Sequence, residues 1–250
     1  MATSNPTLGA FNRVGALGAT FDTSGTMTLD GTINKAGILG FLLAMAFAFT
    51  WTGMAQAAQA GVPAEAPIMI GAIGGLIIAV IISFKPVVAP YLSPVYALVE
   101  GFVLAAISYP LEQMYPYIVL QAATMTIATF LVLLFAYKTG LIVVNNTFRA
   151  VIVGATMTIF LYYLVGMVGM LFHFTLPGLG FQGGWLSIGI SVVFVVVAAL
   201  NLVLDFDFIA RSAGSAPKYM EWYGAFALLV TLVWLYLELL RLLAKMRSRN

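Results

Sequence analysis

Two aspartates stand inside a hydrophobic run near the C-terminus, in the segment Ala-Leu-Asn-Leu-Val-Leu-Asp-Phe-Asp-Phe-Ile over residues 199–209. An ionisable side chain at membrane depth costs roughly 2.5–3.5 kcal/mol on insertion scales, and such residues usually serve a function. The chemistry open to an intramembrane carboxyl is to attract a cation or to gain and lose a proton. Asp205 and Asp207 are therefore the first candidates for a functional site.

The two aspartates differ in their neighbours. Positions two apart on a helix point roughly 200° away from each other, so the two cannot both line one narrow path. Asp207 has Arg211 four residues on, the spacing of a helical ion pair, so a locally paired charge is as good an interpretation as a functional one. Asp205 has only Asn201 as a polar neighbour within one turn, and an amide cannot neutralise charge. Asp205 must find a partner on another helix, face water, or stay protonated.

Three further acids lie in or beside apolar runs. Glu221 opens the last run, just across a short loop from the two aspartates, so three acids at similar depth would repel one another and attract cations, with Lys218 softening the effect. Glu100 has no basic partner within a turn and is the second functional candidate. Glu238 has Arg241 three residues on, which favours a local ion pair.

The composition describes the elements that must position these acids. The chain is 62% hydrophobic and 8% charged, whereas soluble domains carry about 25% charged residues, so a soluble globular fold is excluded. Since about 20 apolar residues span a bilayer as a helix, we predict an all-α polytopic membrane protein with a seven-transmembrane-helix bundle as one domain over 37–245. A flexible polar tail over 1–36 precedes it and a basic end over 246–250 follows it. The apolar runs are 37–58, 67–84, 92–109, 116–137, 149–172, 185–208 and 222–243.

Several classes of chemistry are excluded. The absence of cysteine removes disulfides, thiolate metal sites and cysteine nucleophiles. A single histidine, His173, cannot make a zinc site, and a serine–histidine protease would need it to face a buried serine such as Ser187, which nothing marks as a nucleophile. A net charge of +2 with dispersed basic residues does not indicate nucleic acid. We therefore predict no enzyme, no catalytic or metal-binding residues and no cofactor, with the lipid bilayer as the main partner.

Lysine and arginine give the orientation. The three loops predicted to be external, 58–66, 110–116 and 173–184, contain no Lys or Arg, so the N-terminus is predicted to be cytoplasmic in the cell membrane. The exception is the segment from Arg241 to Arg249, which seven crossings would place outside. Either this basic end departs from the rule, or the last run is re-entrant. The basic residues of the inner segments are Arg13, Lys35, Lys85, Lys138, Arg149, Arg211 and Lys218.

These residues carry a resemblance to a known family. The run 205–209, the Gly214-centred loop, Lys218-Tyr219-Met220 and the closing Leu-Tyr-Leu-Glu-Leu-Leu-Arg-Leu-Leu of 235–243 resemble the C-terminal signature of the Bax inhibitor-1 family, with its bacterial YccA-like branch as the nearest form. Ala-Leu-Val-Glu-Gly-Phe over 97–102 looks like the glutamate–glycine motif of the family's third span. Asn-Pro at 5–6 in a polar tail is similar to an actinobacterial-type subgroup. The resemblance covers most of the chain from about residue 35.

The resemblance implies a seven-helix membrane protein. Some members of the family pass calcium down its gradient in a pH-sensitive way, through paired aspartates on the last two helices. Asp205 matches the first aspartate, but the position of the second falls near Thr231, and no acid lies between Glu221 and Glu238. Glu221 could replace it by lying at the same depth. Glu100, Thr231 and Glu238 are the pore-lining candidates.

We therefore predict a pH-sensitive cation leak channel, with calcium as the ion that the resemblance suggests. Asp205 would be the gate, and Asp207 and Glu221 would be accessory pH-sensing acids. The rival hypothesis is a non-conducting regulatory protein that binds and modulates a membrane protease or another partner, with the polar tail 1–36 as its contact. A proton-coupled transporter is a third hypothesis, but the inverted repeats that would support it are not visible in the sequence.

Overall fold

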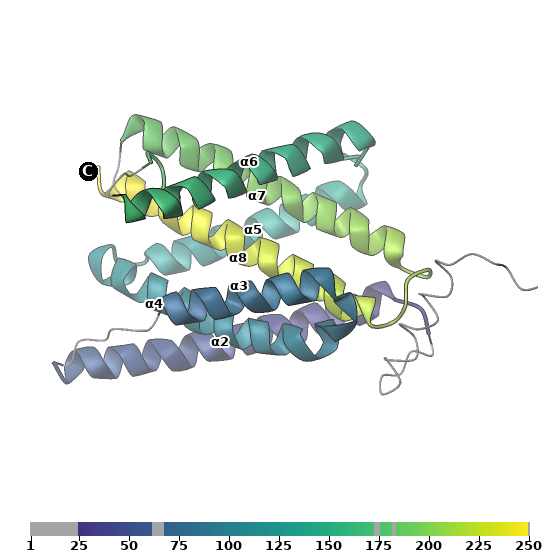
Figure 1. Cartoon of the computed structure of the whole chain (residues 1–250), viewed down its shortest axis with the longest axis horizontal. Helices are drawn as coiled ribbons and strands as arrows, with labels where there is room; N and C mark the ends of the chain where they lie inside the picture. The colour runs from purple at the N-terminus through teal and green to yellow at the C-terminus, as the bar shows by residue number, and fades with distance from the viewer. Residues whose placement is uncertain (1–24, 62–67, 173–175, 182–183, 250) are drawn as a thin grey trace, which may run out of the picture.

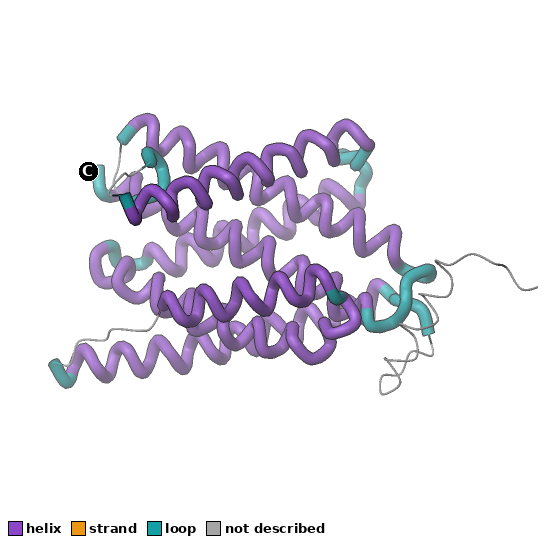
Figure 2. The backbone as a smooth tube through the Cα atoms, in the orientation of Figure 1, coloured by secondary structure: helices purple, strands orange, loops and turns teal. Residues whose placement is uncertain are grey.

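The computed structural model describes residues 25–61, 68–172, 176–181 and 184–249, and within them the protein is all-helical (Figures 1 and 2). Six helices are long and apolar enough to cross a membrane, and α3 is a shorter apolar helix of 17 residues. The predicted helical class and the seven apolar helices are thus confirmed. The elements are α2 (Leu29–Gln59), α3 (Ile68–Phe84), the 3-10 turn η1 (Pro86–Val88), α4 (Ala89–Met114), α5 (Ile118–Lys138), α6 (Asn146–Leu171), α7 (Trp185–Ser212) and α8 (Met220–Arg247).

Helix α8 is the central helix of the bundle. It packs against α2, α4, α5 and α7, and it carries fully buried side chains such as Leu235 and Leu240. A helix that is apolar on most of its faces is stable only when other helices surround it. At 28 residues it is roughly 42 Å long, and Figure 1 shows it running from the end where α2 begins to the opposite end, where the C-terminus lies. The last run is therefore one unbroken helix along the bundle, with no reversal within it.

The basic residues Arg247 and Arg249 at the C-terminal end are bound to protein groups. Arg247 donates from Nη1 to the Pro116 carbonyl at 2.7 Å and from Nη2 to Gln121 Oε1 at 3.0 Å. The guanidinium of Arg249 lies 3.5 Å from the centroid of the Trp185 ring, where the ring face attracts a cation. These contacts tie the end of α8 to the α4–α5 turn and to the start of α7.

Helix α2 begins earlier than the apolar run suggests, inside the segment assigned to the polar tail. Thr28 is its N-cap, and the Thr28 hydroxyl accepts a hydrogen bond from the Gly31 amide at 3.0 Å. Asp30 lies in the first turn, where the helix dipole favours a negative charge. The N-cap therefore determines that the helix starts at Leu29. The hydrophobic run, which begins only at residue 37, does not predict this start.

The residues before this cap are fastened to the α7–α8 loop. The Met27 amide donates to the Ala216 carbonyl at 2.8 Å, the Gly214 amide donates to the Met27 carbonyl at 2.8 Å, and Thr26 and Pro217 form an isolated antiparallel bridge. The Met27 side chain is fully buried. The start of α2 is thus held beside the end of α7, which is the end of the bundle that carries the two aspartates.

Candidate functional site

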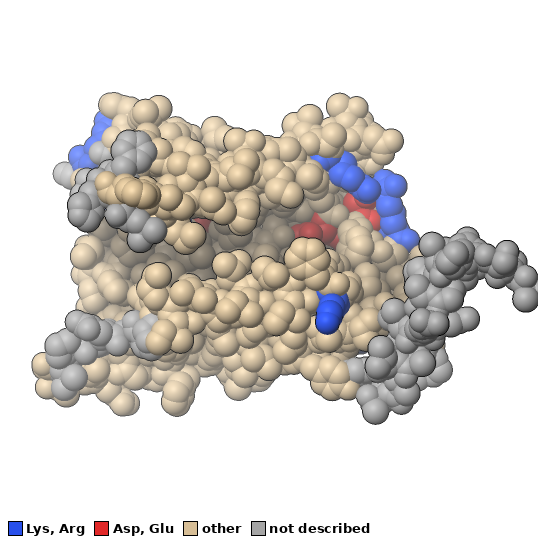
Figure 3. Space-filling model, in the orientation of Figure 1, with Lys and Arg blue, Asp and Glu red and all other residues tan. Residues whose placement is uncertain are grey.

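Asp205 lies on the wall of a cavity of about 500 Å³. The wall is formed by Arg149 and Val153 of α6, by Asn201, Asp205 and Arg211 of α7, and by the α7–α8 loop. Figure 3 shows this face of the molecule hollowed between its upper and lower helices, with acidic side chains visible in the hollow. The cavity is large enough for several water molecules, whose share of liquid volume is about 30 Å³ each.

The Asp205 carboxyl is the unneutralised acid of this site. Its Oδ2 atom is buried and has no hydrogen-bond partner among the described residues. The neighbour that it meets on another helix is the Thr231 hydroxyl of α8. That hydroxyl also lies 3.1 Å from the Ala227 carbonyl. It is a polar neighbour for Asp205 but carries no charge that could neutralise a carboxylate.

Asp207 has the opposite environment. It is only 5% exposed, and its carboxylate accepts from Arg211 Nε at 2.9 Å and from Arg149 Nη2 at 2.7 Å. The ion pair predicted four residues along α7 is confirmed, whereas the Arg149 contact from α6 was not predicted. Arg211 also donates from Nη2 to the Val144 carbonyl at 3.2 Å. Asp207 thus joins the start of α6 to the end of α7 through two bases.

Glu221 faces α2. It is 2% exposed, forms an ion pair with Lys35, and accepts from the Thr28 amide at 2.9 Å and from the Thr28 hydroxyl at 2.8 Å. The approach is close, because a Cβ atom at Gly31 would lie 2.3 Å from Glu221 Oε1. A buried carboxylate with this many partners fixes the packing of α2 on α8.

The structure brings Asp205 and Thr231 together, but it does not bring Glu221 to Asp205. Helices α7 and α8 run antiparallel, and a Cβ atom at Gly224 would lie 3.1 Å from Ile209 Cγ1. Asp205 lies one turn from Ile209 toward the middle of the bundle, whereas Glu221 lies about one turn from Gly224 toward the loop. The helix register therefore places Thr231 within about one turn of the level of Asp205 and keeps Glu221 about two turns away from it.

Glu100 lies at a different contact. A Cβ atom at Gly75 would lie 2.9 Å from Glu100 Oε1, so this half-buried carboxyl packs on α3. The next residue, Gly101, permits a close approach of α2, because a Cβ atom there would lie 2.3 Å from the Leu43 carbonyl oxygen. The glutamate–glycine pair thus lies where α2, α3 and α4 meet, away from the cavity wall that carries Asp205.

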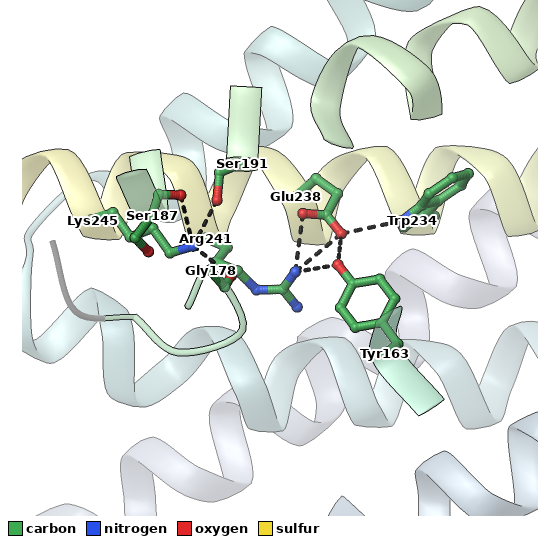
Figure 4. A network of polar contacts seen from close by, with 8 residues as sticks. All are labelled: Tyr163, Gly178, Ser187, Ser191, Trp234, Glu238, Arg241 and Lys245. Carbon is green, nitrogen blue, oxygen red and sulfur yellow. Dashed lines mark hydrogen bonds and ion pairs between the residues drawn. The ribbon is translucent and has the colours of Figure 1, made fainter. Parts of the chain in front are cut away.

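Glu238 is the centre of a second polar network, at the other half of α8 (Figure 4). It is 1% exposed and accepts from Arg241 Nη1 at 3.0 Å and from Trp234 Nε1 at 3.1 Å. The ion pair predicted three residues along the helix is confirmed. The Tyr163 hydroxyl of α6 also donates to Glu238, and this contact between helices was not predicted.

Lys245 lies just beyond the last apolar run of 222–243, and it is fully buried. Its ammonium donates to the Gly178 carbonyl and to Ser191 Oγ, both at 2.6 Å, and to the Ser187 carbonyl at 3.4 Å (Figure 4). The lysine therefore binds the segment before α7 to the end of α8. The sequence signal that could have found it is its spacing of seven from Glu238, which places both on one face of the helix.

A family model described as Bax inhibitor 1 like matches residues 5–248, essentially the whole chain. The chain belongs to this family. As a Bax inhibitor 1 like protein with six helices long enough to span a membrane, it is assigned to the multi-pass membrane proteins. The family is one of membrane channels and regulators and is not known for enzymes. Comparison with curated proteins and with solved structures gave no match.

Two expectations from the sequence concern a serine–histidine site and a metal site. His173, which a serine–histidine site would require, lies outside the described residues. Within the described ranges, no three acidic or histidine side chains gather closely enough to hold a metal ion. The polar groups that a Bax inhibitor 1 like chain brings together here are carboxyls with hydroxyls, arginines and lysines.

Proposed function

We propose that this protein is a pH-sensitive cation leak channel in which protonation of Asp205 is the gate, with calcium as the ion suggested by the family resemblance. One observation carries the proposal: a buried oxygen of the Asp205 carboxyl, with no hydrogen-bond partner among the described residues, belongs to a side chain on the wall of a cavity. Asp207, Glu221 and Glu238 are each paired with a base. Among the acids described on α7 and α8, Asp205 is therefore the one whose charge can change without breaking an ion pair.

The charges around the cavity provide a mechanism. Arg149 and Arg211 line it, and Asp207, which binds both, compensates one of their two positive charges. When Asp205 is protonated, the wall has a net charge of +1 and repels cations. When Asp205 is ionised, the same wall is neutral and presents an unpaired carboxylate to an entering cation. Protonation would close the path and deprotonation would open it.

Flux through the purified protein tests the proposal. In liposomes loaded with a calcium-sensitive dye, we expect calcium entry above that of protein-free liposomes, and faster entry at pH 8 than at pH 6. The expectation follows from the ionised Asp205 being the conducting form. Liposomes that stay silent at both pH values would contradict the proposal and favour the non-conducting regulator.

The proposed orientation places the N-terminus in the cytoplasm of the cell, with 58–66, 110–116 and 173–184 outside. The chain has no cysteine, so single cysteines can be introduced and labelled with a membrane-impermeant thiol reagent on intact cells. Lys85 and Gln113 are both exposed and lie near opposite ends of α4. We expect Gln113→Cys to be labelled and Lys85→Cys to be labelled only after the cells are opened. The reverse pattern would invert the orientation.

A further inference from the structure

Polar side chains recur at intervals of seven residues on two helices that flank α7. Seven residues make about two helical turns, so each row stays on one face of its helix. All three members of the α8 row are buried, at 8%, 1% and 0% exposure in order. The α6 row is Arg149, Thr156 and Tyr163, and the α8 row is Thr231, Glu238 and Lys245.

Side chains of the two rows contact polar groups of α7, and in one case each other, at successive positions along the helices. These contacts follow one another along the helices and form what we call the polar seam of α6, α7 and α8. Its two halves are the Asp205 cavity and the network shown in Figure 4. The contacts are Arg149 with Asp207, Thr231 with Asp205, Thr156 with Asn201, Tyr163 with Glu238, and Lys245 with Ser191.

An apolar layer separates the two halves of the seam. Ile159, Phe194 and Val197 form a buried cluster of their own, distinct from the main core of the bundle, and Trp234 packs against it. The Phe194 ring is held edge-on by Tyr162, with 5.7 Å between the ring centroids.

The order of residues along each helix places this layer between polar groups. On α6, Ile159 falls between Thr156 and Tyr163. On α7, Phe194 and Val197 fall between Ser191 and Asn201. On α8, Trp234 falls between Thr231 and Glu238. Because three neighbouring helices share this alternation, an ion moving along the seam would have to pass the apolar layer.

We infer that Ile159, Phe194 and Val197 form the constriction of the ion path, which an ion entering from the Asp205 cavity meets at the inner end of that half of the polar seam. This inference rests on the proposed leak function and assigns residues to it. A hydrophobic constriction closes a pore by excluding water, since a hydrated ion cannot replace its lost water with apolar side chains. Helix α6 packs mainly on α7, so a small movement of α6 would widen the layer.

The test adds one hydroxyl to the layer at nearly constant volume. Val197→Thr wets the constriction, and Val233→Thr is the matched control, because Val233 is a similarly buried valine, 7% against 8% exposed, in the main core. At pH 6, we expect Val197→Thr to raise calcium entry roughly tenfold, which corresponds to a barrier lower by about 1.4 kcal/mol. Val233→Thr is expected to leave entry unchanged. Ile159→Thr provides a second variant in the layer if Val197→Thr does not fold.

The outcomes separate this inference from the proposed function. If the parent conducts but both layer variants match it, or if Val233→Thr raises flux equally, the constriction is elsewhere and the leak function stands. If the parent is silent and a layer variant conducts, the apolar layer is what blocks the ion path, and the proposed leak function of the parent protein is wrong. If parent and folded layer variants are all silent, both the constriction and the leak are wrong.

Discussion

Replacing Asp205 with asparagine is expected to make calcium entry the same at pH 6 and at pH 8. Asparagine keeps the shape of the side chain but cannot gain or lose a proton. The cavity wall would then keep its net positive charge from Arg149 and Arg211 against Asp207 at every pH. Entry should therefore stay at the slow rate of the parent at pH 6. The measurement is the ratio of the two entry rates in dye-loaded liposomes.

Two matched substitutions show whether the effect belongs to this aspartate. Asp30→Asn changes an exposed aspartate at the same end of the bundle and should keep the pH ratio of the parent. Asp207→Asn should also keep a pH ratio, but it should unfold at a lower temperature, because Arg149 and Arg211 lose their shared carboxylate. A parental pH ratio in Asp205→Asn would remove Asp205 from the gate.

The positions of the helices could be predicted because apolar length alone determines which segments can span a membrane. The ends were less accurate. The predicted loop begins at residue 110, yet α4 continues through Pro110 to Met114. Neighbouring helices and local adjustments can satisfy the backbone groups that a proline frees in a membrane helix. The start of α2 at Leu29 depends on a cap and was also missed.

The candidate site was predictable only where helix geometry decides it. The pairs Asp207–Arg211 and Glu238–Arg241 follow from spacing within one helix, and both are present. The partners from other helices depend on which helices pack together and in what register, and a single sequence does not contain that information. Lys35 with Glu221 is such a contact. For the same reason the sequence suggested Glu221 as the partner of Asp205, because both were expected at the same membrane depth. The packing of α7 on α8 instead places the Thr231 hydroxyl beside Asp205.

Replacing Glu238 with glutamine is expected to cause the largest loss of stability among single substitutions in the polar seam. Glu238 is 1% exposed. Its partner Arg241 has 17% of its side chain exposed and a buried Nε atom that finds no hydrogen-bond partner in the part of the chain that the structure describes. Glutamine would leave the guanidinium charge buried without a counter-charge, and breaking such a pair costs about 3–5 kcal/mol. The measurement is the free energy of unfolding of the purified protein in detergent.

The control removes the arginine as well. Glu238→Gln combined with Arg241→Met has no unpaired buried charge, so it should recover a large part of the stability that the single variant loses. Tyr163 would keep a neutral acceptor in both proteins, because glutamine retains the side-chain carbonyl that receives its hydroxyl. If the double variant were as unstable as the single one, the cost would arise from lost packing and not from the unpaired arginine. The Glu238 carboxylate would then have no neutralising role, and Arg241 would be held by its stacking on the Tyr163 ring, which lies 5.3 Å from the guanidinium carbon.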